Sequence, residues 1–129
     1  MLKTKRVWLF PALSALLLLA LSSIPHFSTD SVSPSISDTF WHVVGYVPLG
    51  FLIHFAVANS PGPFVALPTG WSIILGVSYG TFNELYQYFI PGRAVDFTDM
   101  AANVAGALAG TACFILFRKF SPARKENPA

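Results

Sequence analysis

The sequence is short of charged residues. Asp, Glu, Lys and Arg make up 11% of its 129 residues, against about 25% in soluble domains. Hydrophobic residues make up 53%, so the composition excludes an ordinary water-soluble protein, and the length predicts one domain. Between residues 7 and 117 the charged residues are Asp30, Asp38, Glu84, Arg93, Asp96 and Asp99. Charges near or inside a bilayer are costly and usually mark a functional site.

Other absences exclude further classes of protein. Cys113 is the only cysteine, which excludes an internal disulfide. The sequence has no CxxC, HExxH or GxSxG motif and no Gly-rich phosphate loop, so it predicts neither a metal nor a cofactor. Most basic residues gather near the two ends, as Lys3, Lys5, Arg6, Arg118, Lys119, Arg124 and Lys125. Such flanking charges fix membrane topology and do not indicate nucleic-acid binding.

Four apolar segments are long enough to cross a membrane, which takes about 20 residues. They are residues 7–24, 39–58, 68–89 and 97–117, with connections rich in proline and glycine between them. The pattern predicts an all-α membrane protein, a four-helix transmembrane bundle over residues 7–117 with a tight hairpin between the third and fourth helices. Residues 1–6 and 118–129 are expected to be tails on either side of this domain.

The basic ends place both termini in the cytoplasm, in agreement with an even number of spans. Residues 25–37 contain no Lys or Arg and are expected to face outward, together with the turn at residues 90–96. An alternative stays open for residues 1–22. Basic residues followed by an apolar run and Ala20-Leu21-Ser22 also resemble a cleaved signal peptide.

Polar residues recur at helical spacing near the predicted outer surface. On the second segment Asp38 and His42 are four residues apart and share a face. The third segment carries Gly76, Gly80, Glu84 and Gln87, and the fourth carries Asp99, Asn103, Gly106 and Gly110. Each of these stripes is polar near the surface and glycine deeper in the membrane, where small residues allow close helix contact. If the stripes meet, the polar side chains meet as well.

Arg93 is the only cation within reach of these acids. It lies in the turn Pro91-Gly92-Arg93, and its guanidinium could bind Glu84, Asp96 or Asp99 through two hydrogen bonds. Glu84 lies about 8 Å below the end of its helix, at about 1.5 Å per residue, so it needs a partner or must be protonated. Asp96 also suits the N-cap of the fourth helix, with Asp99 in its first turn. In a purely structural alternative, Arg93 and the acids only pin the hairpin.

A long motif spans the third and fourth segments. Residues 84–110 read ELYQYFIPGRAVDFTDMAANVAGALAG. The order E-x-x-Q, P-G-R, D-x-x-D and N-x-x-G-x-x-x-G resembles the signature of the VanZ-like family, and Asp38 to His42 with Gly45 and Tyr46 resemble its second-helix motif. The resemblance covers residues 38–117. The family commonly has Lys directly after the Asp of the second-helix motif, where this chain has Thr39. Arg93 would then bind an anion alone.

The resemblance implies a small multi-pass protein of the bacterial inner membrane. The family is named for a protein linked to resistance to glycopeptide antibiotics, teicoplanin in particular. Together with the spacing, it makes the polar residues a candidate binding site. Its members are Asp38, His42, Glu84, Gln87, Arg93, Asp96, Asp99 and Asn103.

Several functions stay open for these residues. One is a non-catalytic module that binds an envelope lipid or a membrane protein and alters envelope composition or drug access. Another is an enzyme acting on a lipid-linked or phosphate-bearing envelope molecule, with His42, oriented by Asp38, as general base and Glu84 as general acid. Polar groups in the outer half alone leave no continuous pathway for a transporter or channel. A metal site from His42, Glu84 and Asp99 is chemically feasible, but the spacing does not favour it. Neither the ligand nor the oligomeric state follows from the sequence.

Overall fold

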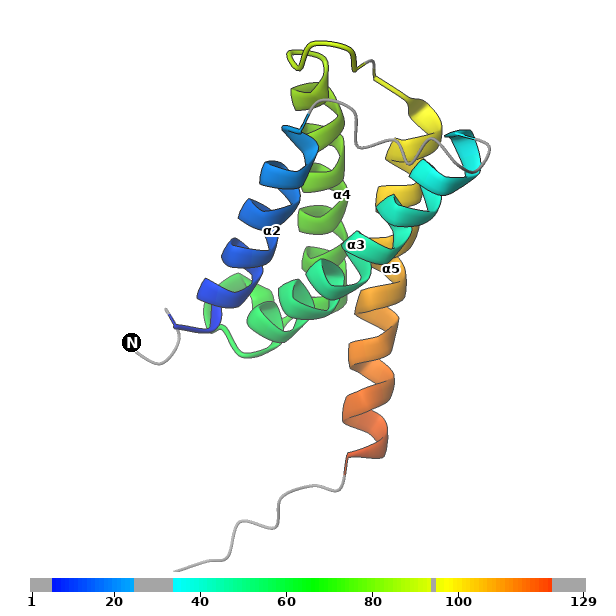
Figure 1. Ribbon diagram of the computed structural model, residues 1–129. Helices are drawn as coiled ribbons and strands as arrows, with labels where there is room; N and C mark the ends of the chain where they lie inside the picture. The colour runs from blue at the N-terminus through cyan, green and yellow to red at the C-terminus, as the bar shows by residue number, and fades with distance from the viewer. Residues whose placement is uncertain (1–5, 25–33, 94, 122–129) are drawn as a thin grey trace, which may run out of the picture.

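The computed structural model describes residues 6–24, 34–93 and 95–121, except for the side chains of residues 34–38. These residues form α2 (Leu9–Ser22), α3 (Pro34–Ala58), the 3-10 helix η1 (Gly62–Val65), α4 (Pro68–Gln87) and α5 (Phe97–Phe120) (Figure 1). No strand occurs within the described ranges. The all-α prediction is thus confirmed for this part of the chain, with a helix in each of the predicted segments.

Two of the helices in the described part of the chain are long and apolar enough to cross a membrane. They are Thr39–Ala58 within α3 and Phe97–Phe120, which is the whole of α5. The apolar helix α2 has 14 residues. At about 1.5 Å per residue this gives about 21 Å, against about 30 Å for the hydrocarbon core. The helix α4 has 20 residues but buries Asn83, Glu84 and Gln87 near its end, which interrupts its apolar character. The four-span bundle therefore stays a prediction.

The backbones of α3 and α5 approach each other closely at glycines. A Cβ atom added to Gly50 of α3 would collide with the backbone oxygen of Ala107, and one added to Gly110 of α5 would collide with that of Val47. Gly106 meets the backbone of α3 in the same way. In Figure 1, α3 crosses α5 obliquely, and the C-terminal half of α5 extends beyond the other helices. Small residues at this crossing allow van der Waals contact between the two backbones.

The glycines of α4 also face α5, but they meet larger residues. A Cβ atom on Gly76 would lie 3.0 Å from the Cβ of Ala107, and one on Gly80 would lie 3.1 Å from the Cβ of Asn103. The two predicted stripes therefore do not meet glycine to glycine, because the glycines of α5 turn towards α3. Gly92 lies in the connection between α4 and α5 with φ at 84°, in the left-handed region that favours glycine.

The core of the protein lies around α3. Its buried side chains include Tyr46, Leu49, Ile53 and Val57, and residues of α2, α4 and η1 pack against them. The hydroxyl of Tyr79 on α4 donates a hydrogen bond to the backbone oxygen of Ala15 on α2. This bond connects the two helices that flank α3.

Candidate functional site

Three helices bring polar side chains together at one end of the protein. The helices α3 and α5 begin there and α4 ends there (Figure 1). We call this set the polar cluster, and its described members are Thr39, His42, Glu84, Gln87, Arg93, Asp99 and Asn103. The members on each helix are separated by about one helical turn, so they share a face. Apart from Thr39, which was not predicted as a site residue, the structure brings together residues that the sequence placed in the candidate site. The side chain of Asp38 lies outside the described residues.

Asn103 connects the other two helices at the centre of the cluster. It is fully buried. Its Nδ2 donates a hydrogen bond of 2.9 Å to Oε1 of Glu84, and its Oδ1 lies 2.8 Å from Nδ1 of His42. Because an amide oxygen only accepts hydrogen bonds, Nδ1 of His42 must be the donor. Rotating the amide by half a turn would set its oxygen against the carboxylate oxygen, so the network favours this assignment.

Glu84 is completely buried on α4, with 0% of its surface exposed. Its Oε1 accepts from Asn103 and, over 3.4 Å, from Nε2 of Gln87. The same oxygen lies 3.6 Å from Nδ1 of His42. Its Oε2 is buried and has no hydrogen-bond partner among the described residues. A buried carboxyl oxygen without a partner is costly, so Oε2 is the atom of this carboxyl group that still needs a hydrogen-bond donor.

His42 lies between two acids. Its Nδ1 faces Asn103 and Glu84, and its Nε2 lies 3.6 Å from Oδ2 of Asp99. The hydroxyl of Thr39 donates to Oδ1 of Asp99 over 3.1 Å. Since 3.6 Å is longer than a hydrogen bond, Nε2 is the ring nitrogen best placed to act on a ligand. Within the described ranges, no group of three or more His, Cys, Asp and Glu residues is arranged to hold a metal ion.

Arg93 joins the cluster through Gln87. Its Nη1 donates a hydrogen bond of 2.8 Å to Oε1 of Gln87, and Gln87 in turn donates to Glu84. The expected ion pair of Arg93 with Glu84, Asp96 or Asp99 does not occur within 4.0 Å among the described residues. The reason is geometric, because Gln87 lies almost one turn closer to the end of α4 than Glu84 and meets the guanidinium first. An arginine carries five N–H donors, so Arg93 retains donors for a further acceptor.

Asp96 stands apart from this network. Its Oδ1 accepts a hydrogen bond of 2.7 Å from the backbone nitrogen of Thr98, and the residue caps the N-terminus of α5. The predicted N-cap is therefore confirmed, and Asp99 lies in the first turn as expected. Asp96 is exposed, and its described contacts explain the start of α5 without requiring a ligand.

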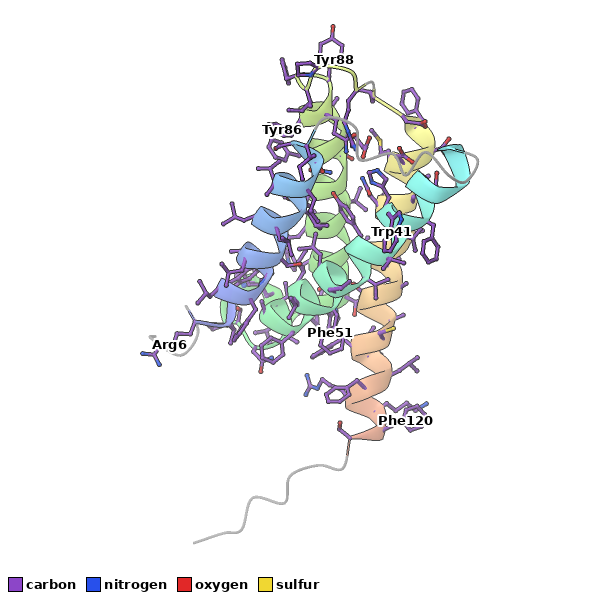
Figure 2. All side chains as sticks on the ribbon, in the orientation of Figure 1. Arg6, Trp41, Phe51, Tyr86, Tyr88 and Phe120 are labelled. Carbon is purple, nitrogen blue, oxygen red and sulfur yellow. The ribbon has the colours of Figure 1, made fainter. Side chains whose placement is uncertain are left out.

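A cavity of about 300 Å³ adjoins the polar cluster. It lies between α2, α3, α4 and the turn that carries Arg93. Its apolar wall consists of Leu18, Leu21, Trp41, Val44, Gly45 and Tyr46. Its polar wall consists of Ser22, His42, Asn83 and Arg93. Figure 2 shows Trp41 on the part of α3 that lies near this end. Because His42 and Arg93 belong to both features, a molecule in the cavity would contact the cluster.

Three further residues of this region were not predicted as site residues, although Tyr46 belongs to the second-helix motif. Asn83 of α4 and Tyr46 of α3 are each 1% exposed, and Ser22 of α2 is 8% exposed. The Nδ2 of Asn83 donates to the hydroxyl of Ser22 over 2.9 Å, which joins α2 to the other helices. Asn83 precedes Glu84 and is a polar residue in an apolar helix. That position is the one signal that could have revealed it.

The comparisons with known proteins support one family. A family model described as VanZ/LLP1 matches residues 4–118. The match includes every member of the polar cluster and all the helices up to Arg118. No curated protein and no solved structure matches the chain.

Proposed function

The chain belongs to the VanZ/LLP1 family, and we propose on this basis that it functions in the bacterial cell envelope. The protein would be a four-span protein of the inner membrane with both termini in the cytoplasm. Its polar cluster would face outward and bind the headgroup of an envelope lipid that carries a phosphate or carboxylate. Through this binding it would alter envelope composition and, with it, susceptibility to glycopeptide antibiotics.

One observation carries this proposal. Glu84 is completely buried and tied to side chains from three helices, yet its Oε2 has no partner among the described residues. If the polar residues served only to stabilise the hairpin between α4 and α5, Arg93 would be expected to pair with an acid, whereas it donates a hydrogen bond to a neutral amide. The arrangement fits a site in which the guanidinium holds an anion and the buried acids receive hydroxyl or amine donors of the same headgroup.

The proposed outward orientation of the polar cluster is supported by the basic residues at the other end of α5. Arg118 and Lys119 lie in the last turn of α5, and the polar cluster lies at the first turns of the same helix. Basic residues at the end of a span favour the cytoplasmic side. The cluster would then face outward, where envelope precursors are assembled and glycopeptides act.

A second candidate is a membrane enzyme that modifies a lipid-linked or phosphate-bearing molecule. The observation that favours it is the orientation of His42, whose Nδ1 is engaged by Asn103 while its Nε2 lies beside Asp99. A histidine held in this way resembles a general base with an orienting partner. Glu84 would act as the acid through Oε2. His42 lines the cavity, where a reacting group would have to lie.

We expect Arg93→Ala and Glu84→Gln variants to fail in complementing a strain that lacks the gene. The readouts are teicoplanin susceptibility and mass spectrometry of the envelope lipids, with immunoblots of the membrane fraction as a check on protein level. Arg118→Ala is the matched control, because it removes an exposed arginine at the other end of the chain. It should complement like the wild type.

Full complementation by both variants would contradict the proposal. Loss of both variants from the membrane would instead support a purely structural role of Arg93 and Glu84. A His42→Ala variant separates the two candidates. If a covalently modified lipid depends on His42, the protein is a membrane enzyme. If lipid levels change without a new covalent species, the protein acts by binding.

A further inference from the structure

We propose that the cavity beside the polar cluster binds an anionic phospholipid of the bilayer. The phosphate lies at Arg93, the glycerol ester region lies between Tyr46 and Asn83, and one acyl chain leaves along α2 and α3. This inference rests on the proposed function and names the ligand of that site. Three independent features of the cavity lead to it.

The first feature is an apolar wall that opens to the side of the protein. Leu21, Trp41 and Val44 line the cavity and keep between 38% and 49% of their surface exposed. The seam between α2 and α3 is therefore not sealed at this level. Deeper along the seam the helices meet, because a Cβ atom on Gly45 would lie 3.0 Å from Cδ2 of Leu18. A hydrocarbon chain can enter such a seam from the bilayer and stay in contact with it.

The second feature is a pair of polar atoms that an acyl chain cannot satisfy. The hydroxyl of Tyr46 and Oδ1 of Asn83 are buried and form no hydrogen bond of normal geometry among the described residues, although the two side chains lie close enough to interact with each other. Both residues line the cavity. The Tyr46 hydroxyl can donate to an ester carbonyl, and the Asn83 oxygen can accept from a glycerol hydroxyl. Burying such groups without a partner is costly. The occupant must therefore carry polar atoms between its charged and apolar parts.

The third feature is charge complementarity at the polar end. Arg93 lies on the wall of the cavity, and its side chain makes one described hydrogen bond, to Gln87. Its further N–H donors suit a phosphate oxygen. A second copy of this chain or another apolar helix would cover the seam but would offer no acceptor to the remaining N–H donors of Arg93 and no polar group to the Tyr46 hydroxyl or to Oδ1 of Asn83. The sequence of cation, neutral polar atoms and apolar wall matches the order of groups in an anionic phospholipid.

Native mass spectrometry of the purified full-length protein tests this inference. The protein in detergent is titrated with dioleoyl phosphatidylglycerol and, separately, with glycerol phosphate. We expect one lipid per chain and no binding of glycerol phosphate over the same range. Val44→Trp, which fills the cavity from its wall, should weaken lipid binding roughly tenfold or more. Ile74→Trp adds the same bulk to α4 at an exposed position off the cavity and should bind as the wild type does.

Tyr46→Phe keeps the test valid if Val44→Trp folds poorly. It removes a hydroxyl whose interaction with Asn83 lacks normal hydrogen-bond geometry, so the lipid-free protein should be nearly as stable as the wild type. Its lipid affinity should fall several-fold, since one hydrogen bond to the ligand is lost. Unchanged affinity in both Val44→Trp and Tyr46→Phe would overturn the inference.

Arg93→Gln distinguishes this inference from the proposed function. If Arg93→Gln weakens binding of the lipid while the two cavity variants do not, Arg93 binds the headgroup as proposed, but the acyl chain does not occupy the cavity. Binding of glycerol phosphate as tight as binding of the lipid would likewise mean that the acyl chain does not contribute to binding in the cavity. If none of the three variants changes binding, both proposals fail.

Discussion

A Gly110→Ala variant is expected to lower the free energy of unfolding by about 3 kcal/mol or more. The added Cβ would collide with the backbone oxygen of Val47 and lie 2.7 Å from the backbone nitrogen of Phe51. Backbone atoms of a helix cannot rotate away as a side chain can, so α5 would have to separate from α3. Overpacking of this kind costs about 1–3 kcal/mol and occasionally more, and the backbone collision places this variant at or above the upper end. Total stabilities are about 5–15 kcal/mol.

Unfolding of the purified protein in detergent micelles measures this effect, and Gly70→Ala is the matched control. Gly70 lies in α4, and the nearest heavy atom to its added Cβ is 3.7 Å away, an ordinary contact. Alanine in a helix is favoured over glycine by roughly 0.5–1 kcal/mol, so this variant should be as stable as the wild type or more stable. Equal stabilities for Gly110→Ala and the wild type would contradict the close α3–α5 contact.

An Asn103→Leu variant is expected to lower the free energy of unfolding by about 2–5 kcal/mol. It removes the hydrogen bond of His42 Nδ1 and the shorter of the two hydrogen bonds to Glu84 Oε1. The loss of a buried partner costs roughly 1–3 kcal/mol for each group, and more for a charged group. Leucine has a similar size but neither the donor that Glu84 Oε1 accepts nor the oxygen that faces His42. Asn103 is 0% exposed, so water cannot replace the lost bonds.

Thr111→Val serves as the control for this change on the same helix. Thr111 is 4% exposed, and its side chain has no hydrogen bond within the described part of the chain. Removing its hydroxyl should therefore lower the free energy of unfolding much less. The two variants are compared by chemical unfolding in the same detergent. Similar losses for Asn103→Leu and Thr111→Val would mean that the bridge through Asn103 adds nothing beyond the burial of a polar residue.

The helices were the part of the fold that the sequence predicted best. Apolar runs between proline and glycine clusters placed a helix in each of the four segments, because burial of an apolar face and chain breakers leave a direct trace in the sequence. The meeting of His42, Glu84, Asp99 and Asn103 was also predictable. Their spacing puts them on helix faces, and an alternating direction of the helices puts those faces at one end.

Contacts that depend on how the helices cross could not be predicted. The glycines at 106 and 110 pack against the backbone of α3 and not against the glycines of α4, since helical spacing defines a face but not its partner. The prediction that Arg93 pairs with an acid was wrong for a related reason. Charge alone favours an acid, whereas the end of α4 presents Gln87 first. The cavity depends on α2, which carries no distinctive residues in the sequence.

Thermal unfolding with and without an anionic phospholipid is the sharpest test of anion binding at Arg93. A ligand that binds only the folded state raises its stability, by about 2.7 kcal/mol at a hundred times Kd. Wild type and Arg93→Gln are compared in one detergent, with and without dioleoyl phosphatidylglycerol. We predict that lipid-free Arg93→Gln unfolds at a Tm only slightly below that of the wild type, because it loses the hydrogen bond of the guanidinium to Gln87, and that the lipid raises the Tm of the wild type alone. Equal increases in both proteins, or a much lower Tm of lipid-free Arg93→Gln, would contradict anion binding at this residue and make Arg93 a structural residue.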